Sequence, residues 1–235
     1  MQFAPNAWRY ALPPLVLAPL AFVLSVFAAF SLVLVGLFVL AFFRDPERTP
    51  PASGVVAPAD GRISVRRREA DGRVRVGVFM NVWNVHVVRS PDDGTVEDVE
   101  HTPGAHRPAF SKDSDRNERV HLRFAEEFSE VVDRSPEEVT PVDETTPVDE
   151  VTPVDEVTPV DEVTLVAGAF ARRITPYVDP GARVDRGERV GHIAFGSRVD
   201  VVFPESVSLD DVAVERGQRV RAGETPLLTP DTPRS

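Results

Sequence analysis

The chain has 235 residues, with 26 basic and 37 acidic side chains and a formal net charge of −11. This length suits one domain with appendages. The absence of cysteine excludes disulfides, cysteine-ligated zinc and a thiol nucleophile. The acidic balance argues against a nucleic-acid partner.

A long apolar run near the N-terminus predicts a membrane anchor. Tyr10–Phe43 has no charged residue over 34 positions, whereas a helix needs roughly 20 to span a bilayer. Three prolines interrupt its first part, so we expect one helix over Leu20–Phe43, with a two-helix hairpin as the alternative. We assign residues 1–43 to the anchor and residues 44–235 to a separate domain.

Arginines are distributed unevenly around this run. Arg9 alone precedes it, whereas Arg44, Arg48 and four arginines within 62–68 follow it. Cytoplasmic flanks of membrane helices are enriched in Lys and Arg. The sequence therefore predicts a protein of the cell membrane whose C-terminal domain faces the cytoplasm.

Short β-branched and aromatic runs, separated by Gly, Pro and Asp, follow the anchor. They predict a mainly β (α+β) domain with few helices. The expected strands are Val55–Val56, Ile63–Val65, Val74–Phe79, Val85–Val88, Val120–Phe124, Val199–Phe203 and Val212–Val214.

A tandem repeat carries the acidic excess. Thr-Pro-Val-Asp-Glu recurs with a period of six from Thr140, and Glu137–Glu162 holds ten acidic residues and no basic one. Proline in each copy prevents strand pairing, and the paired acids repel each other. We expect residues 137–164 to form a disordered surface insert.

A second repeat concerns the fold. The pattern G-x-R-V-x-x-G-E occurs at 181–188 and again at 217–224. A glycine turn followed by this pattern is typical of biotinyl/lipoyl-type β-sandwiches. By analogy we expect a duplicated biotinyl/lipoyl-like β-sandwich.

Three short motifs could carry chemistry. Gly196-Ser197 precedes an apolar strand, Asp60-Gly61 resembles a hairpin turn, and His86 lies in a run of alternating valines. Taken singly, each motif is explained without a catalytic role, as a turn or as a half-buried histidine.

In order, however, the motifs resemble the short type of phosphatidylserine decarboxylase proenzyme, including its archaeal relatives. The resemblance covers nearly the whole chain except the acidic repeat. The motifs that carry it are Phe42–Arg48, Pro58–Gly61, Phe79–His86, Asn117–Arg119, Ala167–Ile174, Gly187–Gly191 and Phe195–Asp200. Relatives with an HxxH pattern have a histidine where this chain has Trp83.

The resemblance implies a self-processing enzyme. Cleavage between Gly196 and Ser197 would give a β chain, residues 1–196, and an α chain, residues 197–235. Ser197 would attack the Gly196 carbonyl and become a covalent pyruvoyl cofactor. By analogy His86 would be the base, with Asp60 orienting its imidazole.

The resemblance also implies the reaction and the partners. The pyruvoyl ketone at position 197 would form a Schiff base with a serine phospholipid, phosphatidylserine or archaetidylserine, and carbon dioxide would leave to give the ethanolamine lipid. His86 is a candidate proton donor for that step. We expect a homo-oligomer at the membrane. Candidates for holding the lipid phosphate are Arg119, Arg172, Arg173 and Arg198.

Two other classes compete with this interpretation. A membrane-tethered lipoyl-like adaptor fits the fold, but the only lysine, Lys112, lies far from either glycine turn in the sequence. A zinc peptidase would need paired histidines, and the five histidines form neither HxH nor HExxH. Neither class explains Gly196-Ser197 with its companions.

Overall fold

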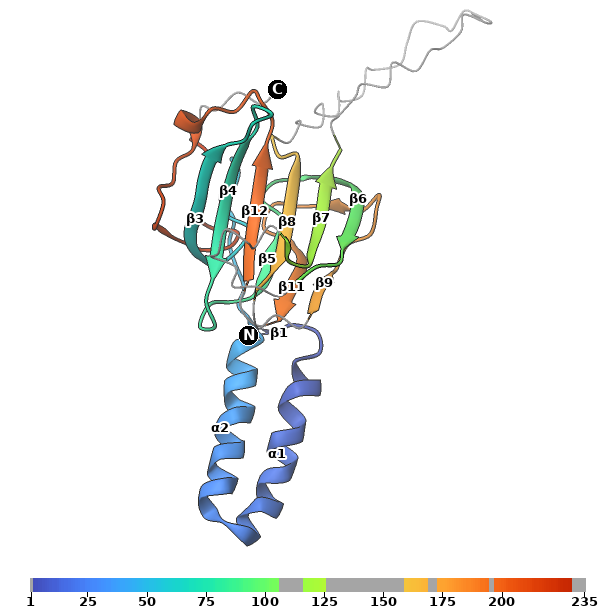
Figure 1. Ribbon diagram of the computed structural model, residues 1–235, viewed down its shortest axis with the longest axis vertical. Helices are drawn as coiled ribbons and strands as arrows, with labels where there is room; N and C mark the ends of the chain where they lie inside the picture. Colours follow the sequence, from blue (N-terminus) through green and yellow to red (C-terminus); the bar gives the residue numbers. More distant parts are fainter. Residues whose placement is uncertain (1, 106–115, 126–158, 169–172, 195–196, 230–235) are drawn as a thin grey trace, which may run out of the picture.

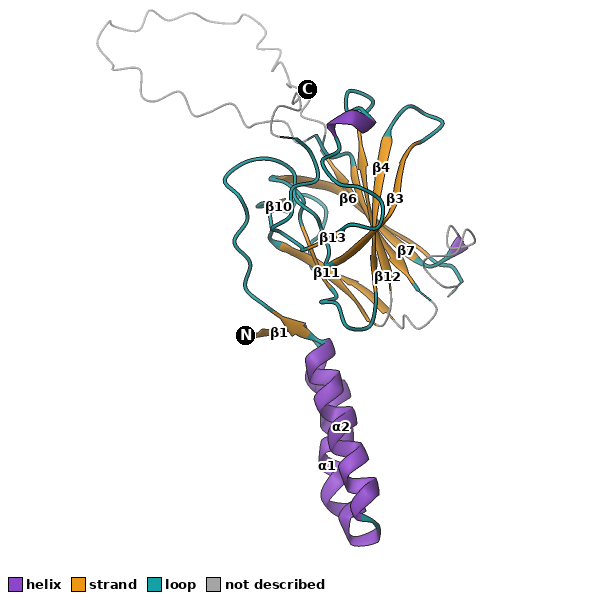
Figure 2. Ribbon diagram, turned by 90° about the vertical axis from the view of Figure 1, so that its left-hand side faces the viewer, coloured by secondary structure: helices purple, strands orange, loops and turns teal. Residues whose placement is uncertain are grey.

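A computed structural model describes residues 2–105, 116–125, 159–168, 173–194 and 197–229. A helical hairpin projects from one end of a β domain, as Figures 1 and 2 both show. The described elements are β1 (Gln2–Phe3), α1 (Ala7–Leu24), α2 (Val26–Phe42), β2 (Arg44–Asp45), β3 (Gly61–Arg68), β4 (Val74–Met80), β5 (Val87–Arg89), β6 (Gly94–Thr102), β7 (Arg119–Phe124), β8 (Glu162–Ala167), β9 (Arg173–Pro176), β10 (Arg183–Val184), β11 (Arg189–Ala194), β12 (Ser197–Phe203), the 3₁₀ turn η2 (Leu209–Asp211) and β13 (Arg219–Val220).

The apolar run folds as two helices. The single helix expected over Leu20–Phe43 is wrong, because the chain reverses at Ser25, whose extended backbone ends α1 and whose Oγ caps α2. The prolines are tolerated inside α1. At 1.5 Å per residue the helices are each about 26 Å long. By length and composition α1 can cross a membrane, and α2 is a slightly shorter apolar helix.

An antiparallel eight-stranded sheet forms most of the domain, in the order β10-β6-β7-β8-β12-β4-β3-β13. It curls as a half-barrel, and a three-stranded sheet, β5-β11-β9, packs against its inner face. Valines dominate the core between them, which includes Val78 from β4, Leu165 from β8, Val199 from β12 and Ile193 from β11. Strand β12 lies near the centre of the large sheet, paired with β4 on one side and β8 on the other.

The two G-x-R-V-x-x-G-E segments occupy equivalent places. Each supplies one edge strand of the large sheet, β10 or β13, and each buries the valine of its pattern. All four glycines have positive φ, a conformation that L side chains rarely adopt. A Cβ added to Gly223 would lie 3.5 Å from the Cα of Gly187, so the two turns pack against each other.

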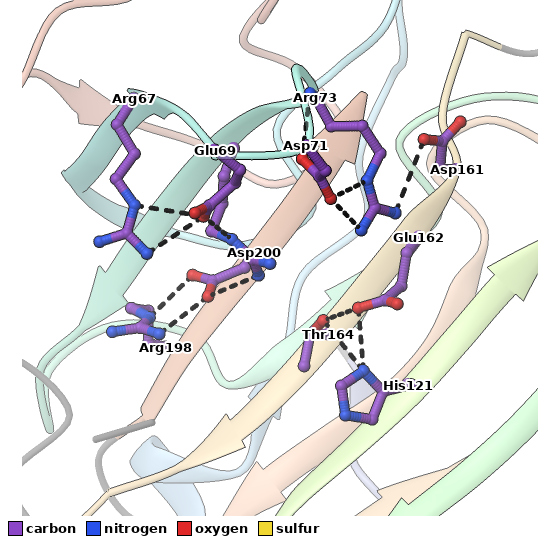
Figure 3. Close-up of polar contacts among 11 residues, drawn as sticks. Arg67, Glu69, Asp71, Arg73, His121, Asp161, Glu162, Thr164, Arg198 and Asp200 are labelled. Carbon is purple, nitrogen blue, oxygen red and sulfur yellow. Dashed lines mark hydrogen bonds and ion pairs between the residues drawn. The ribbon is translucent and has the colours of Figure 1, made fainter. Parts of the chain in front are cut away.

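The outer face of the large sheet carries a network of ion pairs, shown in Figure 3. Asp200 is buried and accepts two hydrogen bonds from Arg198, at 2.7 and 2.8 Å, while Arg75 lies 3.5 Å away. On the neighbouring strands Glu162 pairs with His121 at 2.9 Å. The buried charge of Asp200 requires a partner, and Arg198 supplies it.

Several strand expectations need correction. Ile63–Val65, Val74–Phe79, Val120–Phe124 and Val199–Phe203 fall inside strands, but Val55–Val56 and Val212–Val214 form only single bridges, at Val56 and Val212. For Val85–Val88, strand β5 begins at Val87.

The acidic insert also ends earlier than expected. Residues 162–164 belong to β8, and Val163 and Thr164 are buried. The last copy of the repeat therefore contributes to the central sheet. The remainder of the expected insert, through residue 158, lies outside the described residues.

Candidate active site

Ser197 is the first residue of β12, at the end of the sheet nearest the hairpin (Figure 1). It pairs in register with Met80 on β4 and Ala167 on β8. The residue is 0% exposed, and its Oγ forms no hydrogen bond with any residue that the structure describes. A buried hydroxyl without a partner is uncommon and is compatible with a reactive role. Gly196 lies outside the described residues.

His86 lies just before β5, and its ring is buried. The imidazole packs on the ring of Phe42 in α2, with 4.3 Å between ring centroids. Nδ1 lies 3.0 Å from the carbonyl oxygen of Asn84. Because a carbonyl only accepts hydrogen bonds, Nδ1 carries the proton in this contact and Nε2 carries the lone pair.

The surroundings of His86 keep it neutral. The pKa of His86 is lowered to about 4, mainly by burial; the hydrogen bond to the Asn84 carbonyl opposes this shift, and Arg44 and His192 add to it. At pH 7 the imidazole is therefore neutral, so that it can accept a proton as a base. This finding favours the expected role of proton acceptor over that of proton donor in the resting protein.

Two backbone contacts bring the His86 and Ser197 segments together. Ser197 pairs with Met80, and the carbonyl of His86 accepts a hydrogen bond of 3.2 Å from the Ile193 amide. Met80 and His86 are separated by one short loop, and Ile193 precedes Ser197 by four positions in the sequence. His86 and Ser197 therefore lie at the same corner of the domain, which we call the active corner.

Asp60 has other partners. Its carboxylate accepts two hydrogen bonds from Arg48, at 2.9 and 3.0 Å, and one of 2.9 Å from the Ala222 amide. None of these contacts joins Asp60 to His86. The negative charge of Asp60 is compensated by Arg48.

The Phe42–Arg48 motif fastens the hairpin to this corner. Arg44 donates a 2.6 Å hydrogen bond to the carbonyl of Trp83, in the loop that leads to His86. Asp45 is buried and bonds both Arg89 and Arg189. The end of α2 is thus tied to strands β5 and β11.

His192 and Tyr177 are site neighbours that the sequence reasoning did not single out. His192 is buried, and its Nδ1 lies 2.8 Å from the Tyr177 hydroxyl. Burial lowers the pKa of His192 to about 4, with Arg173 acting in the same direction, and burial raises the pKa of Tyr177. The sequence signal that could have identified His192 is its position directly after the Gly187–Gly191 motif.

The cationic candidates for a phosphate site do not gather here. Arg198 is buried and committed to Asp200, and Arg119 donates to the carbonyl of Asn117. Arg173 is exposed, and Arg172 lies outside the described residues. Within the described ranges no three His, Asp or Glu side chains are grouped as a metal site would need.

A cavity of about 640 Å³ opens beside the corner. Phe79 and Asn81, which flank Met80 in the sequence, line it together with Asn84, whose carbonyl contacts His86. Asp60 also lines it. The cavity is therefore adjacent to both the Ser197 and the His86 segments.

Comparisons with known proteins agree on one family. The model of the phosphatidylserine decarboxylase family matches residues 35–133 and 160–227. A protein of Halobacterium salinarum with the provisional name archaetidylserine decarboxylase proenzyme is 49% identical, covering 95% of this chain and 96% of its own length. A phosphatidylserine decarboxylase proenzyme of Thermobifida fusca is 44% identical over 79% of this chain and 70% of its own. A protein of Methanopyrus kandleri, provisionally named like the first, is 37% identical over 97% of this chain and 98% of its own.

Proposed function

Because the chain belongs to the phosphatidylserine decarboxylase family, it is an enzyme that removes carbon dioxide from the serine head group of a phospholipid, and we propose that it does so with a pyruvoyl group made from its own Ser197. The observation that carries this proposal is the buried Ser197 Oγ without a partner among the described residues, in the same corner as a neutral imidazole. A hydroxyl nucleophile and a base of this kind fit a residue that is to be converted in place.

Self-cleavage would follow from these two residues. Ser197 Oγ attacks the carbonyl carbon of Gly196, and His86 Nε2 accepts the hydroxyl proton. The C–N bond then breaks and the Ser197 nitrogen takes up this proton, so that an ester replaces the peptide bond. Loss of the Ser197 α-proton next breaks the Cβ–Oγ bond and releases the Gly196 carboxylate. Water converts the resulting dehydroalanine to the pyruvoyl group and ammonia. The role of Asp60 is the positioning of this corner, through Arg48 and the Ala222 amide.

When bound in the mature enzyme, the pyruvoyl group supplies a carbonyl that condenses with the substrate amine and draws electrons from the departing carboxylate. The residues of the chain provide a corner in which water is largely excluded, since Ser197, His86 and Ala194 are all buried. A dry corner strengthens these electrostatic effects.

The helical hairpin would hold the enzyme at its substrate. We place residues 1–43 in the cell membrane and the β domain on the cytoplasmic side, because arginines follow the apolar run. The lipid remains in the bilayer, so the active corner needs to lie near the surface, and α2 contacts His86 directly through Phe42. Phosphatidylserine and archaetidylserine share the serine head group, and relatives named for both support either as substrate. We expect the enzyme to act as a homo-oligomer.

We also propose that the domain arose by duplication, as in the lipoyl-like sandwiches. The equivalent edge strands β10 and β13 and the contact between Gly187 and Gly223 support this proposal.

Intact mass of the purified protein, with and without Ser197→Ala, tests self-processing. The parent should give a chain of residues 1–196 and a chain of residues 197–235 that is lighter by about 17 Da than a serine-started peptide, because nitrogen leaves as ammonia. Ser197→Ala should give one uncleaved chain without decarboxylase activity. A single uncleaved chain in folded parent protein would contradict the proposal and favour the membrane-tethered adaptor.

A further inference from the structure

The cavity beside the active corner is lined by an excess of hydrogen-bond donors. Three arginines, Arg62, Arg219 and Arg221, line it. The one carboxylate in its wall, Asp60, is already bonded to Arg48, whose side chain is 7% exposed. Arg221 is itself paired with Glu224 at 3.4 Å, so the net positive charge of the cavity comes mainly from Arg62 and Arg219.

Two of these arginines lie side by side without a carboxylate between them. Arg219 on β13 pairs in register with Arg62 on β3, and like charges directly opposite on neighbouring strands destabilise a sheet. Arg62 donates one hydrogen bond to the Gly217 carbonyl. The Arg219 side chain makes no hydrogen bond or ion pair with any residue in the described ranges. An anion between the two guanidinium groups would remove this repulsion.

Two asparagines add donors to the same wall. Asn81 Oδ1 accepts a hydrogen bond from the Trp83 amide, and Asn84 Oδ1 accepts one from the Asn81 amide. Because both oxygens are occupied by N–H donors, each side chain still has its amide NH₂ group to offer. Neither NH₂ group forms a hydrogen bond with a residue that the structure describes. Guanidinium and amide N–H groups together match the oxygens of a phosphate.

The position of the cavity points to a lipid as the source of the phosphate. Trp83 lines the cavity, is 71% exposed, and contacts Phe38 of α2 edge-on, with ring centroids 5.8 Å apart. An exposed tryptophan against an apolar helix is typical of the membrane–water interface. The cavity volume lies within the range of roughly 300–1,000 Å³ that small-molecule sites have.

We infer that this cavity binds the phosphodiester of the serine phospholipid, with Arg62 and Arg219 as its main ligands and Arg221 beside them. The inference rests on the proposed function for the identity of the lipid. The wall formed by Asn81 and Asn84 then leads the serine group toward His86 and Ser197.

Trp83 supplies a direct readout. The chain has two tryptophans, so Trp8→Phe leaves Trp83 as the only one. In full-length Trp8→Phe/Ser197→Ala protein in neutral detergent, we expect short-chain phosphatidylserine to change the Trp83 emission. Arg62→Gln with Arg219→Gln should weaken that binding about tenfold or more, as expected for lost charged hydrogen bonds. The matched control, Arg68→Gln with Arg123→Gln, removes the same charge from exposed sites elsewhere and should change affinity less than about twofold.

Further titrations identify the ligand. Diacylglycerol, which lacks phosphate, should not bind, and inorganic phosphate should compete with phosphatidylserine in the parent but not in the Arg62/Arg219 variant. Phosphatidylglycerol that binds as tightly as phosphatidylserine would overturn the substrate assignment, because it would indicate a general site for anionic lipids. Equal affinity of the Arg62/Arg219 variant and the control would overturn the site itself.

Kinetics separate this inference from the proposed function. With Ser197 intact, the Arg62/Arg219 variant should cleave itself fully, and its KM for phosphatidylserine should rise about tenfold with little change in kcat. Normal cleavage with an unchanged KM would overturn the inference and leave the proposed function standing. A parent that neither cleaves nor decarboxylates, yet binds phosphate through these arginines, would overturn the proposed function and support the phosphate site.

Discussion

Two buried histidines near the active corner have neutral side chains at physiological pH. His86 packs under Phe42, and His192 bonds Tyr177, and each has a pKa of about 4 in the folded protein. A neutral imidazole can accept the Ser197 proton, whereas a protonated one cannot. The same burial makes the fold sensitive to acid.

The sign of this sensitivity follows from the proton count. Between about pH 6.5 and 4 the unfolded chain binds protons on both histidines and the folded chain does not, so the free energy of unfolding falls as the pH falls. At pH 5 each histidine should account for about 2 kcal/mol of this loss. Urea denaturation of uncleaved Ser197→Ala protein in detergent, at pH 7.5 and pH 5, measures it.

His192→Gln isolates one histidine in that experiment. All other titrating groups are retained, so its loss of stability between the two pH values should be about 2 kcal/mol smaller than that of the parent. An identical loss in both proteins would show that His192 is not buried in its neutral form.

At the scale of elements, strand β8 begins within the last copy of the acidic repeat and continues into the domain. Val160 and Val163 are buried, and Glu162 pairs with His121, although all three lie in the last copy of the acidic repeat. The earlier copies, from Thr140, have the same composition but lie outside the described residues. The last copy directly precedes the apolar Leu165–Ala167 in the sequence, and its Val160 and Val163 belong to the core.

Two deletions distinguish the earlier copies from the last one. Removing residues 140–157 takes out three whole six-residue units, and we expect self-cleavage and stability close to those of the parent. Removing residues 140–163 also takes out Val160, Glu162 and Val163, and should destabilise the domain by at least about 3 kcal/mol, since each buried valine contributes about 1.5 kcal/mol or more. Denaturation midpoints and cleavage yield compare the two. Loss of folding in the shorter deletion would mean that the earlier copies pack against the domain.

The sequence predicted those strands that are runs of β-branched and aromatic residues. Val74–Phe79 and Val199–Phe203 are such runs, both lie inside strands, and the residue pattern identifies them. It could not identify β8, because the repeat hides its first residues, nor the two-residue edge strands β10 and β13, which depend on pairing partners far along the chain.

The main residues of the candidate site could be predicted from the sequence, but their contacts could not. The family resemblance named Ser197 and His86, and the structure brings their segments to one corner. It could not assign the Arg48 contact to Asp60, nor the cross-strand neighbours Arg62 and Arg219, because these pairs depend on sheet register and not on local pattern. For the same reason the four arginines named from sequence as phosphate ligands did not include them.

At the scale of the whole molecule, the hairpin and the β domain are joined through chemistry-bearing residues. Phe42 and Phe43 share a small apolar cluster with Val85, Val87 and Ala194, next to the active corner. Asp45 continues this contact with its bonds to Arg89 and Arg189. The helical hairpin therefore contributes to the apolar surroundings of the site and is more than an attachment.

Strand β12 lies near the centre of the sheet, so the proposed cleavage at its start would change folding from a one-chain to a two-chain process. The proposed cleavage falls at its first residue, yet the strand remains paired along its length with β4 and β8. Under the proposed cleavage this pairing would hold the two products together noncovalently, and folding would change from a one-chain reaction to a two-chain association. After denaturation and dilution, uncleaved Ser197→Ala protein should refold at a rate independent of its concentration, whereas the mature enzyme should refold more slowly as it is diluted. A concentration-independent rate for both would contradict the separation into two chains. We therefore expect the sheet to assemble in the cell while the chain is still continuous, because reassembly from two separate chains would be slower and would depend on their concentration.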